Sequence, residues 1–146
     1  MVNFTAVVAS LLALAVVASA HPNSRLFARQ SDVSCLDGEN NPFTENGIAS
    51  EAVECINDLA SKGTDACVAG TATSFCRRGN TQITGISTKA ASGEDSAGTT
   101  TTTCQDIAQA AGRIMDLCSR GNGDVKGQTL AFANTDMLVD IRSVAE

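Results

Sequence analysis

The sequence predicts an α+β fold, in which two helices pack on a small antiparallel β-sheet and form a two-layer sandwich stapled by disulfides. Three observations support this fold class. Apolar residues recur at helical spacing in residues 50–62 and 104–118. Residues 80–88 and 137–143 have the β-branched composition or the two-residue alternation of strands. The chain also contains six cysteines, an even number.

The beginning of the 146-residue chain has the pattern of a secretory signal. Residues 6–17 form an apolar run that is too short to span a bilayer, and small residues at positions 18–20 supply a cleavage site. Residues 1–20 are therefore expected to be a signal peptide; the alternative is a buried N-terminal helix. No second apolar run follows, so we expect a secreted, extracellular protein without a membrane anchor.

A second processing step is expected at Arg29, because the step to Gln30 resembles the single-basic sites of secreted proteins. Residues 21–29 are then a pro-segment and residues 30–146 a single disulfide-stabilised domain; the alternative is a leader that stays attached. The domain keeps all 16 acidic residues and eight of the ten basic ones, which gives a net charge of −8. It loses the only histidine, His21.

This composition excludes several function classes. An acidic surface argues against binding to nucleic acid or anionic lipid. A domain without histidine has no His-based catalytic triad and no His-ligated metal. We therefore expect neither a nucleic-acid partner nor a cofactor.

The cysteines are expected to form three disulfides in an oxidising compartment, with 15 possible connectivities. The alternative is a thiolate metal site, which favours paired Cys-x-x-Cys motifs, and the sequence has none. The expected disulfide residues are Cys35, Cys55, Cys67, Cys76, Cys104 and Cys118.

The clearest element is the helix predicted over residues 104–118. Thr103 and Asp106 resemble a capping box at its start. One face is apolar and consists of Cys104, Ile107, Ala108, Ala111, Ile114, Met115 and Cys118.

The length of this helix restricts the disulfides. Cys104 and Cys118 are separated by 14 residues. That separation is roughly 21 Å of helix, whereas a disulfide joins Cα atoms within about 7 Å. The two cysteines are therefore expected to pair outside the helix, with Cys55, Cys67 and Cys76 as plausible partners. Cys35 would then tie down the N-terminal loop.

The helix predicted over residues 50–62 has its own signals. Ser50 can cap its start, and Gly63 is expected to stop it. Asp58 and Lys62 are four residues apart, which is the spacing of an ion pair on the solvent-exposed face of a helix.

Outside the two predicted helices, the apolar residues show less regular spacing, so composition and turn residues guide the prediction. Residues 33–36 suggest a short strand among turn residues, residues 64–78 have no clear pattern, and residues 80–88 predict a strand. Residues 87–103 are rich in Ser, Thr, Gly and Ala and are expected to be an exposed, mobile loop. For the run from Thr99 to Thr103, O-glycosylation and an unmodified loop both stay open.

The end of the chain predicts two more extended segments, residues 128–134 and 137–143, joined by a turn at residues 134–136. In the last segment, alternate residues separate into a buried face of Met137, Val139 and Ile141 and an opposite face of Leu138, Asp140 and Arg142.

One pattern, Cys-x-Arg-Gly-Asn-x-x-[Ile/Val]-x-Gly, starts at Cys76 and again at Cys118, an offset of 42. One interpretation is a disulfide-stapled turn that leads into a strand. The other is a pair of equivalent basic turns that form one site. Gly-Asn is ordinary turn chemistry, which favours the structural interpretation.

No catalytic constellation stands out, and we expect no enzyme. The acidic residues would allow the carboxylate pair of a glycoside hydrolase, but the sequence has no Trp or Tyr on which a sugar ring could stack. The turn beginning at Asp37 fails as a calcium loop, because Pro42 and Ile48 stand where Gly and Glu are required. A serine nucleophile would lack a base.

Several features between residues 75 and 142 match a known pattern. Cys76 and Gly79-Asn80 precede an Ile-rich strand, a helix has a cysteine at each end, and a turn at Asn134 leads into the strand of residues 138–141. In these features the chain resembles small secreted cysteine-rich fungal proteins of the killer-toxin-like and necrosis-inducing effector α/β-sandwich families. In architecture it also resembles a fungal glycan-binding family with a helix, strand, helix, strand order.

The sequence also departs from these families. The killer toxins carry more cysteines and a basic functional surface, whereas this chain is acidic, and the aromatic residues of the glycan-binding family are missing. The resemblance therefore implies the fold and the compartment, and no functional residue.

Together these observations predict a non-enzymatic, secreted effector or toxin-like protein, a candidate for a role in virulence, that recognises an extracellular protein or glycan. One alternative is a cell-wall or matrix-associated structural protein, which the Thr-rich run supports. Another is a small glycan hydrolase. The oligomeric state stays open.

Overall fold

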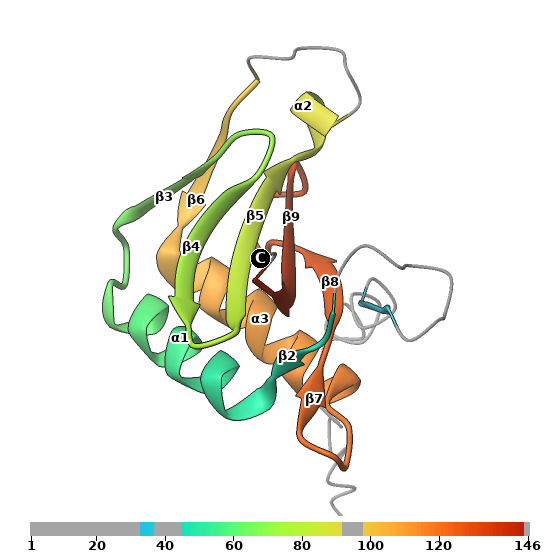
Figure 1. The fold of residues 1–146 in the computed structure, drawn as a ribbon. Coiled ribbons are helices and arrows are strands. Elements are labelled where there is room, and N and C mark those ends of the chain that lie inside the picture. The colour runs from blue at the N-terminus through green and yellow to red at the C-terminus, as the bar shows by residue number, and fades with distance from the viewer. Residues whose placement is uncertain (1–32, 37–44, 92–97, 145–146) are drawn as a thin grey trace, which may run out of the picture.

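The computed structural model describes residues 33–36, 45–91 and 98–144 (Figure 1). It confirms the predicted fold class: two long helices lie on one face of a five-stranded antiparallel sheet, and disulfides connect the two layers.

Helix α3, at Cys104–Cys118, has the predicted bounds. The Thr103 hydroxyl oxygen accepts a hydrogen bond from the backbone N–H of Asp106 at 3.1 Å, and the same hydroxyl donates to the Asp106 carboxylate at 2.7 Å. This reciprocal pair explains why the helix begins at Cys104, because it satisfies a backbone N–H that the first helical turn leaves without a partner.

Helix α1, at Ala49–Ser61, starts one residue earlier than predicted. Ser50 is not its cap, so that prediction is wrong. Ile48 takes the N-cap position without a side-chain bond. The backbone N–H groups of Ile48 and Ala49 donate instead to the Thr81 hydroxyl at 2.7 Å and to the Gly123 carbonyl at 2.8 Å. Gly63 follows the helix with φ of +55°, which confirms the predicted stop.

The main sheet has the strand order β1-β8-β9-β5-β4, and every pair is antiparallel. β9 is its middle strand and hydrogen-bonds to β5 along its whole length. The five strands are β1 at Ser34–Cys35, β4 at Thr73–Arg78, β5 at Thr81–Ser87, β8 at Gly127–Leu130 and β9 at Met137–Ser143.

Two short ribbons complete the fold. β2 at Gly47–Ile48 pairs with β7 at Asp124–Val125, and β3 at Ala66–Ala69 pairs with β6 at Thr100–Thr103.

The structure corrects the prediction of an exposed loop over residues 87–103. A short helix, α2, spans Thr88–Ala91, and β6 buries Thr100 and Thr102. The threonines form a strand because β3 supplies a hydrogen-bonding partner and because the Thr102 hydroxyl donates to Asp106 of α3 at 2.8 Å. Residues 92–97 lie outside the described residues.

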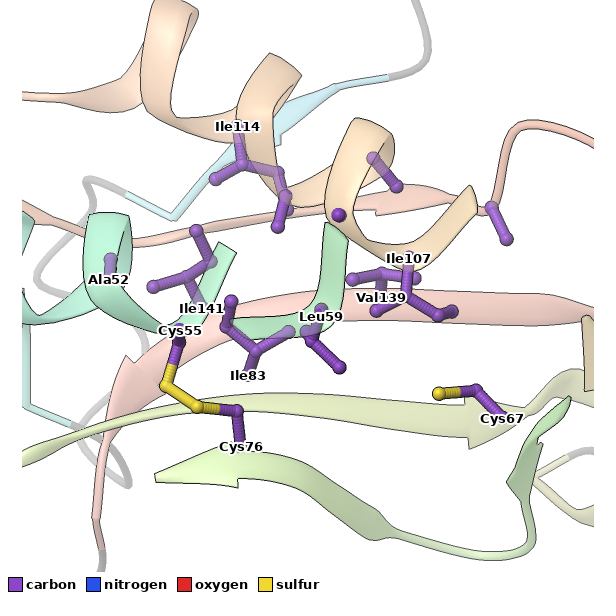
Figure 2. Packing of buried hydrophobic residues seen from close by; sticks show 14 of the residues in the cluster. Ala52, Cys55, Leu59, Cys67, Cys76, Ile83, Ile107, Ile114, Val139 and Ile141 are labelled. Atoms are coloured by element: carbon purple, nitrogen blue, oxygen red, sulfur yellow. A yellow bond between two sulfur atoms is a disulfide. The ribbon is translucent and has the colours of Figure 1, made fainter. Parts of the chain in front are cut away.

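The apolar core lies between the helices and the face of the sheet turned toward them, which we call the inner sheet face (Figure 2). Ile83, Val139 and Ile141 of that face meet Leu59 of α1 and Ile114 of α3.

The two layers approach closely at Gly127, on β8. A Cβ at Gly127 would lie 2.8 Å from the Ile114 Cγ2 atom and 2.9 Å from the Cys118 sulfur. Only glycine therefore fits at this position without displacing α3.

Each of the three disulfides joins a helix to a strand. Cys55 of α1 bonds to Cys76 of β4, Cys67 of β3 to Cys104 of α3, and Cys35 of β1 to Cys118 of α3. Cys104 and Cys118 thus pair outside α3, as predicted, and Cys67 is one of the expected partners.

The partner of Cys118 was not predicted. Cys35 was expected only to fix the N-terminal loop, whereas it bonds to the C-terminal end of α3. The reason is that β1 pairs with β8, and β8 lies against α3 at Cys118.

Candidate functional site

Two polar regions lie on opposite sides of the main sheet. The first, the helix-side charge cluster, consists of Glu54, Asp58, Lys62 and Arg78. The second, the outer sheet face, is turned away from the helices. Its polar members on β4, β5, β8 and β9 include Arg77, Gln82, Thr84, Gln128, Asp140 and Arg142.

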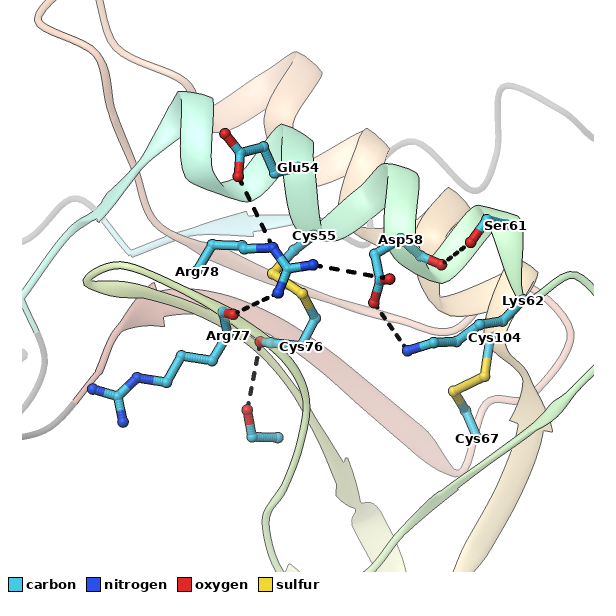
Figure 3. Close-up of polar contacts among 11 residues, drawn as sticks. Glu54, Cys55, Asp58, Ser61, Lys62, Cys67, Cys76, Arg77, Arg78 and Cys104 are labelled. Carbon is cyan, nitrogen blue, oxygen red and sulfur yellow. Dashed lines mark hydrogen bonds and ion pairs between the residues drawn. A yellow bond between two sulfur atoms is a disulfide. The ribbon is translucent and has the colours of Figure 1, made fainter.

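The helix-side charge cluster connects α1 to β4 (Figure 3). The Lys62 amine lies 3.0 Å from the Asp58 carboxylate, which confirms the predicted pair. The Arg78 guanidinium lies 3.9 Å from both Glu54 and Asp58. The hydrogen bond from Lys62 lowers the pKa of Asp58, and the positive charges of Lys62 and Arg78 lower it further. All four groups are partly exposed, and such surface pairs stabilise a fold weakly.

The two consecutive arginines of β4 point to opposite sides, as alternate residues of a strand do. Cys76 faces α1 through its disulfide, so Arg77 turns to the outer sheet face and Arg78 returns to the helix side. In Figure 3, the Arg77 side chain extends away from α1, and no ion pair joins its guanidinium to another described residue.

Strand register places the outer polar residues in two rows. Arg77 is opposite Gln82, and Gln82 is opposite Arg142. In the second row, Thr84 is opposite Asp140, and Asp140 is opposite Gln128. Residues from four separate strands, far apart in sequence, therefore meet on one face.

An ion pair with a buried carboxylate and a partly exposed guanidinium lies on the middle strand of this face. One Arg142 guanidinium nitrogen lies 3.0 Å from the Asp140 Oδ2 atom, and the two side chains are 24% and 9% exposed. Burial raises the pKa of Asp140 to about 6, although the positive charge of Arg142 opposes the rise. Asp140 therefore changes its charge in a mildly acidic medium, unlike an ordinary aspartate.

The pair is incompletely satisfied. The buried Asp140 Oδ1 and Arg142 Nε atoms have no hydrogen-bond partner among the described residues, and neither has the buried Thr84 hydroxyl beside them. Buried polar atoms are usually paired. Of the five buried side-chain atoms without a partner among the described residues, these three lie on the outer sheet face, and the hydroxyls of Ser87 and Thr129 lie on the inner sheet face.

Sequence reasoning did not select this cluster. It predicted that Asp140 and Arg142 lie on the face of a strand opposite its buried face. The face is correct, but Asp140 is buried there as well. The pattern of one strand does not show that the strand lies in the middle of a sheet, where neighbouring strands desolvate its side chains. A carboxylate inside a β-branched strand was the available signal.

The predicted disulfide residues provide no reactive group. All six cysteines are oxidised, and no free cysteine remains. In the part of the chain that the structure describes, no group of three His, Cys, Asp or Glu residues is placed to hold a metal ion.

The two copies of the Cys-x-Arg-Gly-Asn pattern lie in different settings. The first forms the turn between β4 and β5, where Gly79 has φ of +47°. The second follows the end of α3, and there Gly123 rather than Gly121 has a positive φ. Each turn follows a disulfide-bonded cysteine and leads into a strand.

None of the helices within residues 33–36, 45–91 and 98–144 has the length and apolar character needed to cross a membrane. A comparison with curated proteins gives no match. A family model described as a domain of unknown function (DUF8794) matches residues 30–143, which is most of the chain. The chain therefore belongs to this family.

Proposed function

We propose that this chain is a secreted, non-enzymatic recognition protein, of the kind found among killer-toxin-like and necrosis-inducing effectors, and that it binds an extracellular partner through the outer sheet face. The observation that carries the proposal is the set of three disulfides that join helices to strands. Such bonds form and persist in oxidising compartments.

The disulfides also explain how a small, aromatic-poor domain can hold a recognition surface in place. They fix β1, β3 and β4 to the helices. The outer sheet face is then presented on a scaffold in which α1 and α3 pack on the opposite face of the sheet. A rigid surface loses less conformational entropy when it binds.

The family match supports the proposed maturation. It begins at residue 30, which is the residue that cleavage after Arg29 would leave as the new N-terminus.

Secretion is tested by expressing the full chain with its own leader in a eukaryotic host and measuring the intact mass of protein in the medium. We expect a chain that starts at Gln30 and has the mass deficit of three disulfides. A chain that starts at His21 would contradict the second processing step only. A chain retained inside the cell in reduced form would contradict secretion.

Recognition is tested with the purified protein on plant tissue and on competing fungi, by scoring cell death or growth arrest, and by pull-down on insoluble wall polysaccharides. Reduced and alkylated protein is the matched control and should lose the effect. Wall binding without any biological effect would favour a structural protein, and release of soluble sugars would favour a hydrolase.

A further inference from the structure

The outer sheet face differs in charge from the rest of the molecule. The chain has a formal net charge of −6. The strands of the main sheet contribute only three charged side chains to this face, namely Arg77, Arg142 and Asp140. Because Asp140 is paired with Arg142, Arg77 stands as an excess positive charge. The face is therefore a basic site on an acidic protein.

The two arginines are spaced and exposed for contact with a ligand. Arg77 is exposed, and the Arg142 side chain is 24% exposed. Two strand spacings, about 10 Å, separate their backbones, and Gln82 lies between them. Guanidinium groups are well suited to carboxylates, which they bind through paired hydrogen bonds.

The residues around the arginines suit hydroxyl groups. Gln82 and Gln128 are half-buried on the same face, and each amide can both donate and accept. Gln128 lies in the same row as Thr84 and Asp140, and Gln82 lies in the row of Arg77 and Arg142. The row of a cation, an amide and a cation formed by Arg77, Gln82 and Arg142 matches a chain that carries both carboxylates and hydroxyls.

We propose that the outer sheet face binds a carboxylate-bearing polysaccharide, whose carboxylates pair with Arg77 and Arg142 and whose hydroxyls bond to Gln82 and Gln128. The proposal rests on the proposed function and narrows its partner to one chemical class. An acidic polypeptide would supply the carboxylates but not the hydroxyls.

Asp140 makes this site sensitive to pH, because it competes with the ligand for Arg142. On the same face, β5 presents Gln82 and Thr84 and β8 presents Gln128, none of which titrates in mildly acidic medium.

Among the described residues, few other charged groups lie near β9. Asp136 directly precedes the strand and is paired with Lys89 at 2.9 Å. Lys126 precedes β8 and is buried, and Arg77 lies two strands away. Glu45, near the end of β9, is exposed.

α3 packs on the inner sheet face with apolar side chains. Protonation of Asp140 as the pH falls through about 6 therefore releases Arg142, while uronate carboxylates stay charged. Binding should strengthen in mildly acidic medium.

The test is affinity electrophoresis or calorimetry of the oxidised full-length secreted protein with polygalacturonate, at mildly acidic and at neutral pH. The methyl-esterified polymer has the same backbone without charge and is the first control. Poly-glutamate is the second. We expect salt-sensitive binding to polygalacturonate alone, stronger at the lower pH.

Three variants locate the site. Arg77→Gln removes an exposed cation and should weaken binding about five- to tenfold, the effect of one charge-assisted contact. Lys62→Gln makes the same change of charge on the helix side and should leave binding unchanged. Asp140→Asn should remove the pH dependence; because it lies in the core of the sheet, its folding is checked by the melting temperature.

Each other outcome overturns the proposal. Equal losses in Arg77→Gln and Lys62→Gln would place the binding elsewhere. Equal binding of poly-glutamate would show a general anion surface. No binding of polygalacturonate by a protein that still acts on tissue or binds insoluble wall material would reject this partner and leave the proposed function standing.

Discussion

The two faces of the five-stranded sheet are built from alternate residues of the same strands, yet they differ in almost every physical respect. The inner sheet face presents Ile83, Val139 and Ile141 to the helices, and all three are fully buried. The outer sheet face presents Thr84, Asp140 and Arg142, which include the ion pair of the middle strand. Neighbouring residues of one strand therefore serve different purposes: one packs in the apolar core, and the next presents a polar group on the opposite face.

This difference assigns the two roles of the sheet to its two faces: the inner face stabilises the fold, and the outer face is the proposed recognition surface. The inner face has apolar contacts and the disulfides of the helix layer, so changes there should act on folding. The outer face contributes less apolar burial and contains the only ion pair among the described residues whose carboxylate is more than nine-tenths buried. Changes there should act on charge and on the response to pH.

The largest effect is expected on the inner side, from Ile114→Asp. Ile114 is fully buried on α3, and an aspartate there would be a charge without a partner. We expect a loss of about 4 kcal/mol or more in the free energy of unfolding, measured by chemical denaturation. Gln109→Asp, on the exposed side of the same helix, should change it by less than about 0.5 kcal/mol. Comparable losses would mean that α3 is oriented differently.

Removal of one disulfide should have the next largest effect. The Cys55–Cys76 bond closes a loop with a sequence separation of 21 and holds α1 on β4. The double variant Cys55→Ala/Cys76→Ala should lose about 3 kcal/mol in the same measurement. An unchanged denaturation midpoint would show that the packing of Leu59 and Ala52 alone fixes α1.

Asp140→Asn should alter the pH dependence of stability. The folded protein holds the Asp140 proton up to a pH of about 6, whereas the unfolded chain releases it near the ordinary value of 3.8. Stability contributed by this residue is therefore fully present below pH 3.8 and is lost as the pH rises through about 6. Between these two pH values, the difference in unfolding free energy between wild type and variant should change by about 1 to 3 kcal/mol.

Asp106 provides the matched control with the opposite sign. Although burial raises the pKa of Asp106, hydrogen bonds from Thr103 and Thr102 lower it below 3.8 overall. Asp106→Asn should therefore remove stability that is present at neutral pH and is lost in acid. Parallel pH profiles for the two variants would contradict the assignment of the Asp140 carboxyl to a buried site.

The smallest effect is expected in the helix-side charge cluster. Lys62→Ala removes the 3.0 Å pair with Asp58, whose partners are both partly exposed. The free energy of unfolding should fall by less than about 0.5 kcal/mol, and added salt should shrink the difference. A loss above about 1 kcal/mol would mean that Arg78, Glu54 and Asp58 act as a coupled network rather than as separate surface pairs.

The elements that the sequence predicts well are those with strong local signals. α3 has the predicted bounds because its cap, its period and its flanking cysteines all agree. β9 likewise follows its alternation of apolar and polar residues. The strands β3 and β6 were missed, because Ala66–Ala69 and Thr100–Thr103 become strands only through each other.

The candidate site was missed for a related reason. Arg77 and Arg142 come from β4 and β9, and only the strand order of the sheet brings them to one row. The burial of Asp140 depends on the same order, because it is flanked by β5 and β8. Neither the strand order nor the Cys35–Cys118 pairing is contained in local periodicity.

The positions of the disulfides also determine what a single cut in the backbone would do. Every residue from 36 to 117 lies within the loop closed by Cys35 and Cys118, so one cleavage there leaves two fragments still joined by a covalent bond. β9 lies beyond the last cysteine, although it is the middle strand of the sheet. A cleavage between residues 131 and 136 would leave β9 attached only by non-covalent contacts, chiefly its hydrogen bonds to β5 and β8 and its packing. The centre of the sheet is thus the part of the molecule that a protease could separate with one cut.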